Sequence, residues 1–444
     1  MKMSTKTKIV MVGGGSYNWC PRLLSDLIQT DELIGSEIVL LDPNLKAAQE
    51  IKEAMTHLAK TLGRDFRFIP TSDETLAFKN ADFVVITIST GGLSMMKHDL
   101  KIPERYGIWQ TVGDSVGPGG WSRLLRNVQV FEKMARKIEK FSPSAVVLNY
   151  TNPMAGLTGA IAQTTSLRTV GLCHGLFSTY GLIKRLLQVE EKDISVRFGG
   201  INHFFWLLNF KIKGEDGYPL LMKKLKGVSL NEALDRAPRE TPRIHDFCLC
   251  EELLHQYGML TYIEDRHTCE YFPPYLTDRA MLKRFKLIRT TVEERKGMLE
   301  KNREYTLRLA SGNEKMPPRS RETAMDIMKA FVTNTPFVDV VNLPNIGQID
   351  NLPRGAVVET LGLVDSSGFA PIGIGSMPEP LRTLLETHCQ VQKMTLESAL
   401  TGNKELALKA LMLDPLCAKL APSDIRKMGL DLMEATGDYL PQFD

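Results

Sequence analysis

The stretch "KIVMVGGGS" at residues 8–16 decides the fold, because an apolar run passes directly into three consecutive glycines. The segment that follows, "CPRLLSDLIQT" at 20–30, has apolar residues at helical spacing. Glycines between a strand and a helix let the backbone turn tightly and approach a diphosphate, which the first N–H groups of the helix can bind. We therefore predict a dinucleotide-binding turn at Gly13, Gly14 and Gly15, with a plain tight turn as the alternative.

Asp42 indicates which dinucleotide is bound. It ends the next predicted strand, "EIVLLDPN" at 37–44, where a carboxylate can bind ribose hydroxyls and would repel a 2′-phosphate. This position favours NAD over NADP. Asn18 is a departure from the strict G-x-G-x-x-G pattern, because it stands where the third glycine would fall.

The first half of the chain alternates Val- and Ile-rich strands with helical patterns, which is typical of a doubly wound parallel sheet. Ligands of such sheets bind at the carboxyl ends of the strands. The residues expected there to contact NAD are Gly13, Gly14, Gly15, Ser16, Asp42, Thr87, Ser89 and Asn149.

The second half changes character, with paired strand patterns such as "VRFGGINHFFWLLNFKI" from residue 196 and a helical tail from about Glu379. We predict an α/β protein in which a Rossmann-like NAD-binding domain at 1–200 precedes an α+β domain at 201–444. The second domain is expected to complete the metal and substrate site and to provide surface for oligomerisation. No Pro-, Gly- or Ser-rich hinge marks the boundary.

Composition excludes several classes of protein. The charges nearly balance, with 55 Lys and Arg against 52 Asp and Glu, and no long basic run suggests a nucleic-acid partner. No signal-peptide pattern is seen, and no apolar run approaches the roughly 20 residues that a membrane helix needs. Seven cysteines, an odd number, argue for reduced thiols. We expect a cytoplasmic protein.

Cys173 and His174 stand side by side in "GLCHG" at 171–175, and His203 follows in "GGINHFFW" at 199–206. Neighbouring residues of an extended segment point to opposite faces, so one of the first two can face a site while the other packs away. A thiolate with an imidazole suits a divalent transition metal, and two protein ligands leave positions open for substrate or water. An inert core cysteine and a packed core histidine are the alternatives.

Taken together, eight motifs resemble one family. They are "VGGGS", "LLDPN", "VGDSVGPGG" (112–120), "NYTNPM" (149–154), "GLCHG", "GINHFFW", "DRHTCEYFPPY" and "VNLPNIGQIDNLP". Their order and spacing over most of the chain resemble the NAD- and manganese-dependent glycosidases of glycoside hydrolase family 4.

The resemblance implies an unusual hydrolysis, which departs from the scheme of two carboxylates used by most glycosidases. NAD takes a hydride from sugar carbon 3, a base removes the proton on carbon 2, and the metal stabilises the enediolate. The glycosidic oxygen is then eliminated, water adds at carbon 1, and the hydride returns. NAD is therefore recycled.

The resemblance also implies roles for particular residues. Cys173 and His203 would be the ligands of Mn²⁺ or another divalent transition metal. His174 occupies the sugar-specificity position and can help protonate the leaving oxygen. Asn152 would hold sugar hydroxyls, and Asp114 would transfer a proton or support the metal, with a cap of the glycine-rich turn as the alternative.

The residues after Cys173 bear on the sugar. Family members with Cys-His-Gly act on α-glucuronides, whereas other motifs here are at least as similar to the α-galacturonidase branch. The resemblance therefore implies a small substrate with a terminal α-linked uronic acid, either an α-glucuronide or an α-galacturonide, in an oligosaccharide or another glycoside. Arg266 is expected to bind its carboxylate, with an ion pair to Glu264 or Asp265 as the alternative. Tyr271 and His267 are the candidates for the catalytic base.

Other functions remain open at this point. Within the family they are an α-galactosidase and a 6-phospho-α-glucosidase. Outside it they are a lactate/malate-type dehydrogenase, which would need no metal, and a catalytically silent NAD- or sugar-binding regulator. The resemblance implies a homodimer or homotetramer.

Overall fold

The first strand lies inside the sheet with both faces covered, as its unbroken apolar run predicts. The computed structural model describes residues 7–238 and 245–443. In β1 (Lys8–Val12), Ile9 and Met11 pack into one hydrophobic core, and Val10 and Val12 pack into another on the opposite face. Because successive strand residues point to opposite faces, a strand buried on both sides needs apolar residues throughout.

Twelve strands form one sheet in the order β3-β2-β1-β4-β5-β6-β10-β11-β7-β8-β9, with β12 paired to β11. The strands from β1 to β6 pair in parallel. The remaining strands are β2 (Glu37–Leu41), β3 (Arg67–Thr71), β4 (Phe83–Ile86), β5 (Val146–Asn149), β6 (Arg168–Gly171), β7 (Ile194–Ile201), β8 (Phe204–Ile212), β9 (Glu215–Asp216), β10 (Phe337–Pro344), β11 (Val357–Asp365) and β12 (Gly368–Pro371).

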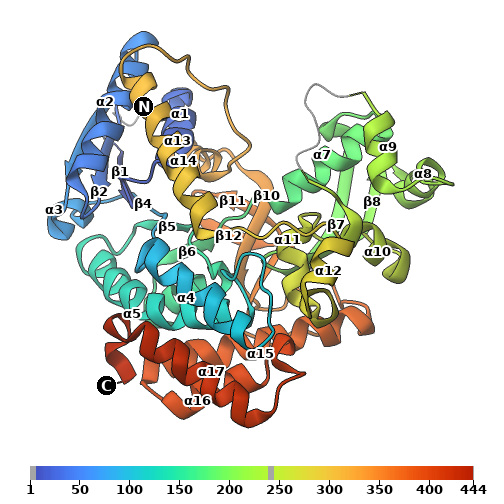
Figure 1. Ribbon diagram of the computed structural model, residues 1–444. Coiled ribbons are helices and arrows are strands. Elements are labelled where there is room, and N and C mark those ends of the chain that lie inside the picture. Colours follow the sequence, from blue (N-terminus) through green and yellow to red (C-terminus); the bar gives the residue numbers. More distant parts are fainter. Residues whose placement is uncertain (1–6, 239–244, 444) are drawn as a thin grey trace.

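Helices cover both faces of the parallel part. The α-helices of the described residues are α1 (Cys20–Ile28), α2 (Leu45–Thr61), α3 (Glu74–Phe78), α4 (Gly92–Arg105), α5 (Gly117–Phe141), α6 (Met154–Thr164), α7 (Gly175–Leu187), α8 (Gly217–Lys224), α9 (Leu230–Arg236), α10 (Cys248–Tyr257), α11 (Asp265–Thr268), α12 (Arg279–Arg284), α13 (Val292–Ala310), α14 (Ala324–Thr333), α15 (Glu379–Thr401), α16 (Lys404–Met412) and α17 (Pro422–Ala435). Figure 1 shows α13 and α14 beside α1 and α2, so a segment from the second half completes the N-terminal layer. None of the helices in the described ranges has the length and apolar character needed to cross a membrane.

The second half continues the same sheet with antiparallel strands. β10 joins β6 through the register pair Asn342–Gly171, and β11 joins β7 through Glu359–Gly200. The helical tail α15–α17 packs below α5 (Figure 1), where Trp121 Nε1 donates to the Ala407 carbonyl at 2.9 Å. The predicted α/β fold class is confirmed, and the division at residue 200 stays a prediction.

Candidate active site

The glycine turn after β1 packs as tightly as its sequence predicts. Gly13 has φ +89°, in the region that favours glycine. A Cβ on Gly14 would lie 2.5 Å from the Leu40 Cα, so no other residue fits there without a shift. The Gly15 N–H donates to Asp42 Oδ2 at 2.9 Å. The turn thus keeps its backbone free of side chains at the helix start, which suits the diphosphate of NAD.

The side chains of the other residues predicted to contact NAD form different hydrogen bonds. Ser16 Oγ accepts the Trp19 N–H at 3.3 Å, which fixes the end of the turn. Thr87, after β4, is buried and donates through Oγ1 to the Val12 carbonyl at 3.3 Å. Ser89, two residues on, accepts a hydrogen bond from Arg123 at 3.2 Å.

Asn149 is completely buried at the end of β5. Its Nδ2 donates to Thr158 Oγ1 at 3.1 Å, and its Oδ1 accepts the Thr151 N–H at 2.9 Å. Its side chain therefore stabilises the backbone that follows β5. Its contact with NAD stays a prediction.

A cluster suited to a metal forms at the same edge of the sheet. Asp114, His203 and His267 are buried, and one ligand atom from each lies within 4.8 Å of the others. His203 sits in the turn between β7 and β8 with φ +61°, a conformation that is uncommon outside glycine. Its Nδ1 lies 3.0 Å from Ser115 Oγ, which in turn donates to Asp114 Oδ1 at 2.9 Å. Two imidazoles and a carboxylate fit a divalent transition metal.

The charge states also suit a metal. Burial alone would raise the pKa of the Asp114 carboxyl, but His267 and Arg123 beside it hold that pKa well below its ordinary value. Burial lowers the pKa of His203 well below its ordinary value and also lowers the pKa of His267. An ionised carboxylate with neutral imidazoles is the form in which these groups bind metals.

Asn152 lies beside this cluster, and its predicted contact with sugar hydroxyls stays a prediction. Its Nδ2 donates to Asp114 Oδ2 at 3.3 Å. The carboxylate of Asp114 therefore connects the loop that carries it to the end of β5.

Glu270 holds that loop in place. Its Oε1 accepts the backbone N–H groups of Val112 at 2.7 Å and Gly113 at 2.9 Å, and also the Thr111 hydroxyl at 3.1 Å. Burial raises the pKa of Glu270 to about 7. The residue before Asp114 is thus tied to a segment far along the chain.

Cys173 and His174 follow β6 and enter different surroundings. Cys173 is buried, and burial raises the pKa of its thiol well above the ordinary value. Within the described part of the chain, the group of three metal-type side chains does not include Cys173. The His174 side chain is 43% exposed, and its ring nitrogens lie 3.5 Å from Glu322 and 3.9 Å from Glu264.

Arg266 and Tyr271 make contacts of a structural kind. Arg266 forms an ion pair with Glu264 at 3.1 Å, which is the alternative considered above. Tyr271 is buried against Phe204, with ring centroids 4.5 Å apart, and its hydroxyl donates to the Asn202 carbonyl at 2.7 Å. The hydroxyl thus supports the turn that carries His203, and its role as a base stays a prediction.

The comparisons with known proteins agree with this geometry. Residues 8–189 match the description "Family 4 glycosyl hydrolase", and residues 198–417 match its C-terminal domain. The chain belongs to glycosyl hydrolase family 4. The predicted family is therefore confirmed, and the dehydrogenase and silent-regulator alternatives are set aside.

Three proteins similar to this family 4 hydrolase illustrate the range of activities within the family. An α-galactosidase of Bacillus subtilis is 34% identical over 98% of this chain and 99% of its own length. An α-galacturonidase of Lachnoclostridium phytofermentans is 33% identical over 98% of this chain and 97% of its own length. A 6-phospho-α-glucosidase from gut microorganisms, solved with NAD and Mn²⁺, has a TM-score of 0.83 at 22% identity and covers 99% of this chain and all of its own, 100%. The predicted glycosidase activity and the predicted cofactors agree with these findings.

Sequence reasoning missed Arg123, on the second turn of α5. Its Nε donates to the Asn152 carbonyl at 3.0 Å and its Nη2 to Ser89 Oγ at 3.2 Å. It therefore lies between two residues predicted to face the cofactor and sugar. The available signal was a cation just after the glycine-rich loop "VGDSVGPGG", in a helix whose surrounding residues are buried.

Proposed function

We propose that this family 4 hydrolase cleaves terminal α-linked uronides, preferably α-galacturonides and secondly α-glucuronides, with NAD and Mn²⁺ as cofactors. The observation that carries the proposal is the cluster of Asp114, His203 and His267, hydrogen-bonded to Asn152 and adjoined by the Arg123 guanidinium. Relatives named α-galacturonidase, such as that of Lachnoclostridium phytofermentans, support the uronide class. A cytoplasmic location and a homodimer or homotetramer belong to the same proposal.

NAD, when bound, supplies reversible hydride acceptance, and the metal supplies Lewis-acid polarisation of sugar oxygens. The residues of the chain position the sugar. Asn152 offers its amide to a sugar hydroxyl, and Asp114 holds that amide in place at 3.3 Å. We assign to His174 the protonation of the leaving oxygen, and its ring nitrogens lie near Glu322 at 3.5 Å and Glu264 at 3.9 Å.

Arg123 is the better candidate for the substrate carboxylate. Within the described residues no contact of its Nη1 is recorded, whereas Arg266 is 45% exposed and already paired with Glu264. A partly buried guanidinium with a free donor can bind a carboxylate strongly, because the interaction is shielded from water. We assign this contact to Arg123 in preference to Arg266.

The test is release of the aglycone from four aryl glycosides: α-galacturonide, α-glucuronide, α-galactoside and 6-phospho-α-glucoside. Each is assayed with and without NAD, Mn²⁺ and a thiol reductant. We expect uronide turnover that requires all three additions and produces no net NADH. Turnover of the α-galactoside alone would make the enzyme an α-galactosidase, the second candidate, which the 34% identical relative favours.

Arg123→Met then tests the carboxylate contact. It should lower kcat/KM for the uronide relative to the galactoside by about tenfold to a hundredfold, because a hydrogen bond to a charged group is lost. Arg266→Met is the matched control and should leave this ratio unchanged. The opposite result would return the contact to Arg266.

A further inference from the structure

The N–H groups available to a diphosphate lie at the end of the glycine turn, just before α1. Those of residues 13–16 are all engaged, with carbonyl groups of the chain or with the Asp42 carboxylate. Within the described part of the chain, the N–H groups of Tyr17 and Asn18 donate no hydrogen bond. Because an anion at a helix start is bound by free backbone N–H groups, these two are the ones that can bind the diphosphate of NAD.

The side chain of Tyr17 is tied to α2 and, through it, to α13. Its hydroxyl donates to Glu50 Oε2 at 2.6 Å. Arg303 of α13 contacts both oxygens of the same carboxylate, with Nε 2.9 Å from Oε2 and Nη2 2.6 Å from Oε1. These hydrogen bonds from Arg303 lower the pKa of Glu50 below its ordinary value. A two-point contact fixes both the distance and the direction of the carboxylate, so Glu50 is held in one orientation as the acceptor for Tyr17.

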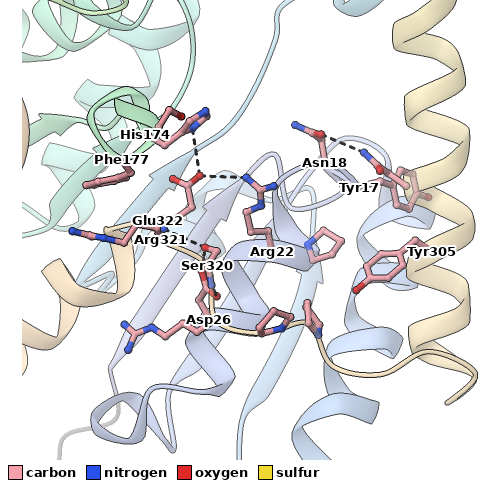
Figure 2. Close-up of a pocket in the computed structure, with 16 residues that line it drawn as sticks. Tyr17, Asn18, Arg22, Asp26, His174, Phe177, Tyr305, Ser320, Arg321 and Glu322 are labelled. Atoms are coloured by element: carbon pink, nitrogen blue, oxygen red, sulfur yellow. Dashed lines mark hydrogen bonds and ion pairs between the residues drawn. The ribbon is translucent and has the colours of Figure 1, made fainter. Parts of the chain in front are cut away.

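Asn18 is tied to α13 directly. It stands where the third glycine of the G-x-G-x-x-G pattern would fall, and its Oδ1 accepts a hydrogen bond from Asn302 Nδ2 at 3.2 Å. Figure 2 shows Tyr17 and Asn18 at one end of a pocket, next to Tyr305 of α13. Two neighbouring residues of α13 therefore hold two neighbouring residues of the turn.

This support matters because the turn is rich in glycine. Three consecutive glycines give the backbone before Tyr17 more conformational freedom than other residues would. A ligand that had to order this segment would lose affinity, since ordering opposes binding. Contacts that fix the Tyr17 and Asn18 N–H groups beforehand remove that cost.

We propose that α13 pre-organises the dinucleotide turn, and that Arg303 and Asn302 are positioning residues for NAD. Arg303 acts through Glu50 and Tyr17, and Asn302 acts through Asn18. The NAD site then depends on a helix from the second half of the chain. This role rests on the NAD part of the proposed function and is independent of which sugar is cleaved.

The experiment measures the Kd for NAD by isothermal titration calorimetry, on the full chain without sugar. Arg303→Met and Tyr17→Phe should each raise this Kd by about fivefold to tenfold, because each removes one hydrogen-bonded link of the same chain through Glu50. The double variant should raise it no further than the single variants do, since both act on one path. Asn302→Ala, which releases Asn18, should add to either effect.

Two measurements separate positioning from a general loss of structure. The Kd for Mn²⁺, followed by the electron paramagnetic resonance signal of the free ion, should be unchanged in Arg303→Met. Arg303→Lys keeps a cationic donor for Glu50 and should restore part of the affinity for NAD.

Arg426→Met is the matched control. Arg426 also contacts both oxygens of a carboxylate on a neighbouring helix, that of Glu405, at 2.8 and 2.6 Å. Its side chain is 43% exposed, against 44% for Arg303, and its loss should leave the Kd for NAD unchanged. A wild-type Kd for NAD in both Arg303→Met and Tyr17→Phe, or an equal rise in Arg426→Met, overturns the role of α13. A wild type that binds no NAD would overturn the cofactor assignment with it.

Discussion

Glu270 accepts the backbone N–H of Gly113 at 2.9 Å, one residue before Asp114 of the metal cluster. The loop that delivers Asp114 is therefore held by a carboxyl group from a distant part of the chain. Because this carboxyl is completely buried, its ionisation is coupled to the stability of the fold.

The first prediction concerns the pH dependence of stability. The pKa of Glu270 is raised from 4.5 to about 7 by burial, so between these values the folded chain keeps a proton that the unfolded chain has released. The contribution to stability is therefore full below pH 4.5 and is lost as pH rises through 7, which amounts to about 3 kcal/mol. Relative to Glu270→Gln, the wild type should lose most of this amount between pH 5 and 7.5 in denaturant unfolding. Parallel curves for the two proteins would contradict it, and Glu300→Gln, at an exposed site on α13, is the control.

The second prediction concerns the metal ligands. Asp114→Asn should weaken Mn²⁺ binding by about tenfold to a hundredfold, measured from the electron paramagnetic resonance signal of free Mn²⁺. Cys173→Ser should also weaken Mn²⁺ binding, because the family resemblance implies that its thiolate is a metal ligand. Cys250→Ser, at a buried cysteine on α10, should bind normally. Normal binding by Cys173→Ser together with loss in Asp114→Asn would restrict the metal to the histidine–aspartate cluster.

The third prediction concerns the choice of dinucleotide. Asp42→Asn keeps an oxygen that can accept the Gly15 N–H but removes the charge that repels a 2′-phosphate. The preference for NAD over NADP, measured as the ratio of the two Kd values, should fall by roughly tenfold or more. Asp65→Asn, at an exposed position before β3, is the control. An unchanged ratio in Asp42→Asn would show that specificity lies elsewhere.

The fourth prediction concerns a buried ion pair behind the site. Asp99 and Arg126 are completely buried and make two hydrogen bonds, at 2.8 and 2.5 Å, and Arg126 also donates to the Thr90 carbonyl. Arg126→Met should lower the free energy of unfolding by about 3–5 kcal/mol, because it leaves a buried carboxylate without a partner. The double variant Asp99→Leu/Arg126→Met should recover most of this loss. A double variant no more stable than the single one would contradict the electrostatic explanation.

Local patterns explain why much of the fold was predictable. The apolar run of β1, the glycines after it and Asp42 at the end of β2 are each encoded within a few neighbouring residues. The structure places them as expected because a strand buried on both faces and a glycine turn are short-range requirements.

The contacts that hold the site residues in place could not be predicted in the same way, because they join distant parts of the sequence. Glu270 contacts a loop 157 residues earlier, Glu322 meets His174, and Arg123 reaches the Asn152 carbonyl from another helix. No local spacing rule links such partners, because they lie on different elements that become neighbours only when the chain folds. Arg266 has a local partner that the sequence did suggest, because it forms an ion pair with Glu264, and its contact with a substrate carboxylate stays a prediction.

The unbroken sheet has a mechanical consequence. β6, which precedes Cys173, is bonded directly to β10, and the strands leading to His203 belong to the same sheet. A hinge between the halves would have to break strand pairing, so the sheet beneath the site is rigid. Entry of the dinucleotide and exit of sugar products then depend on movement of the loops at the edge of this sheet, while the sheet itself keeps its shape during turnover.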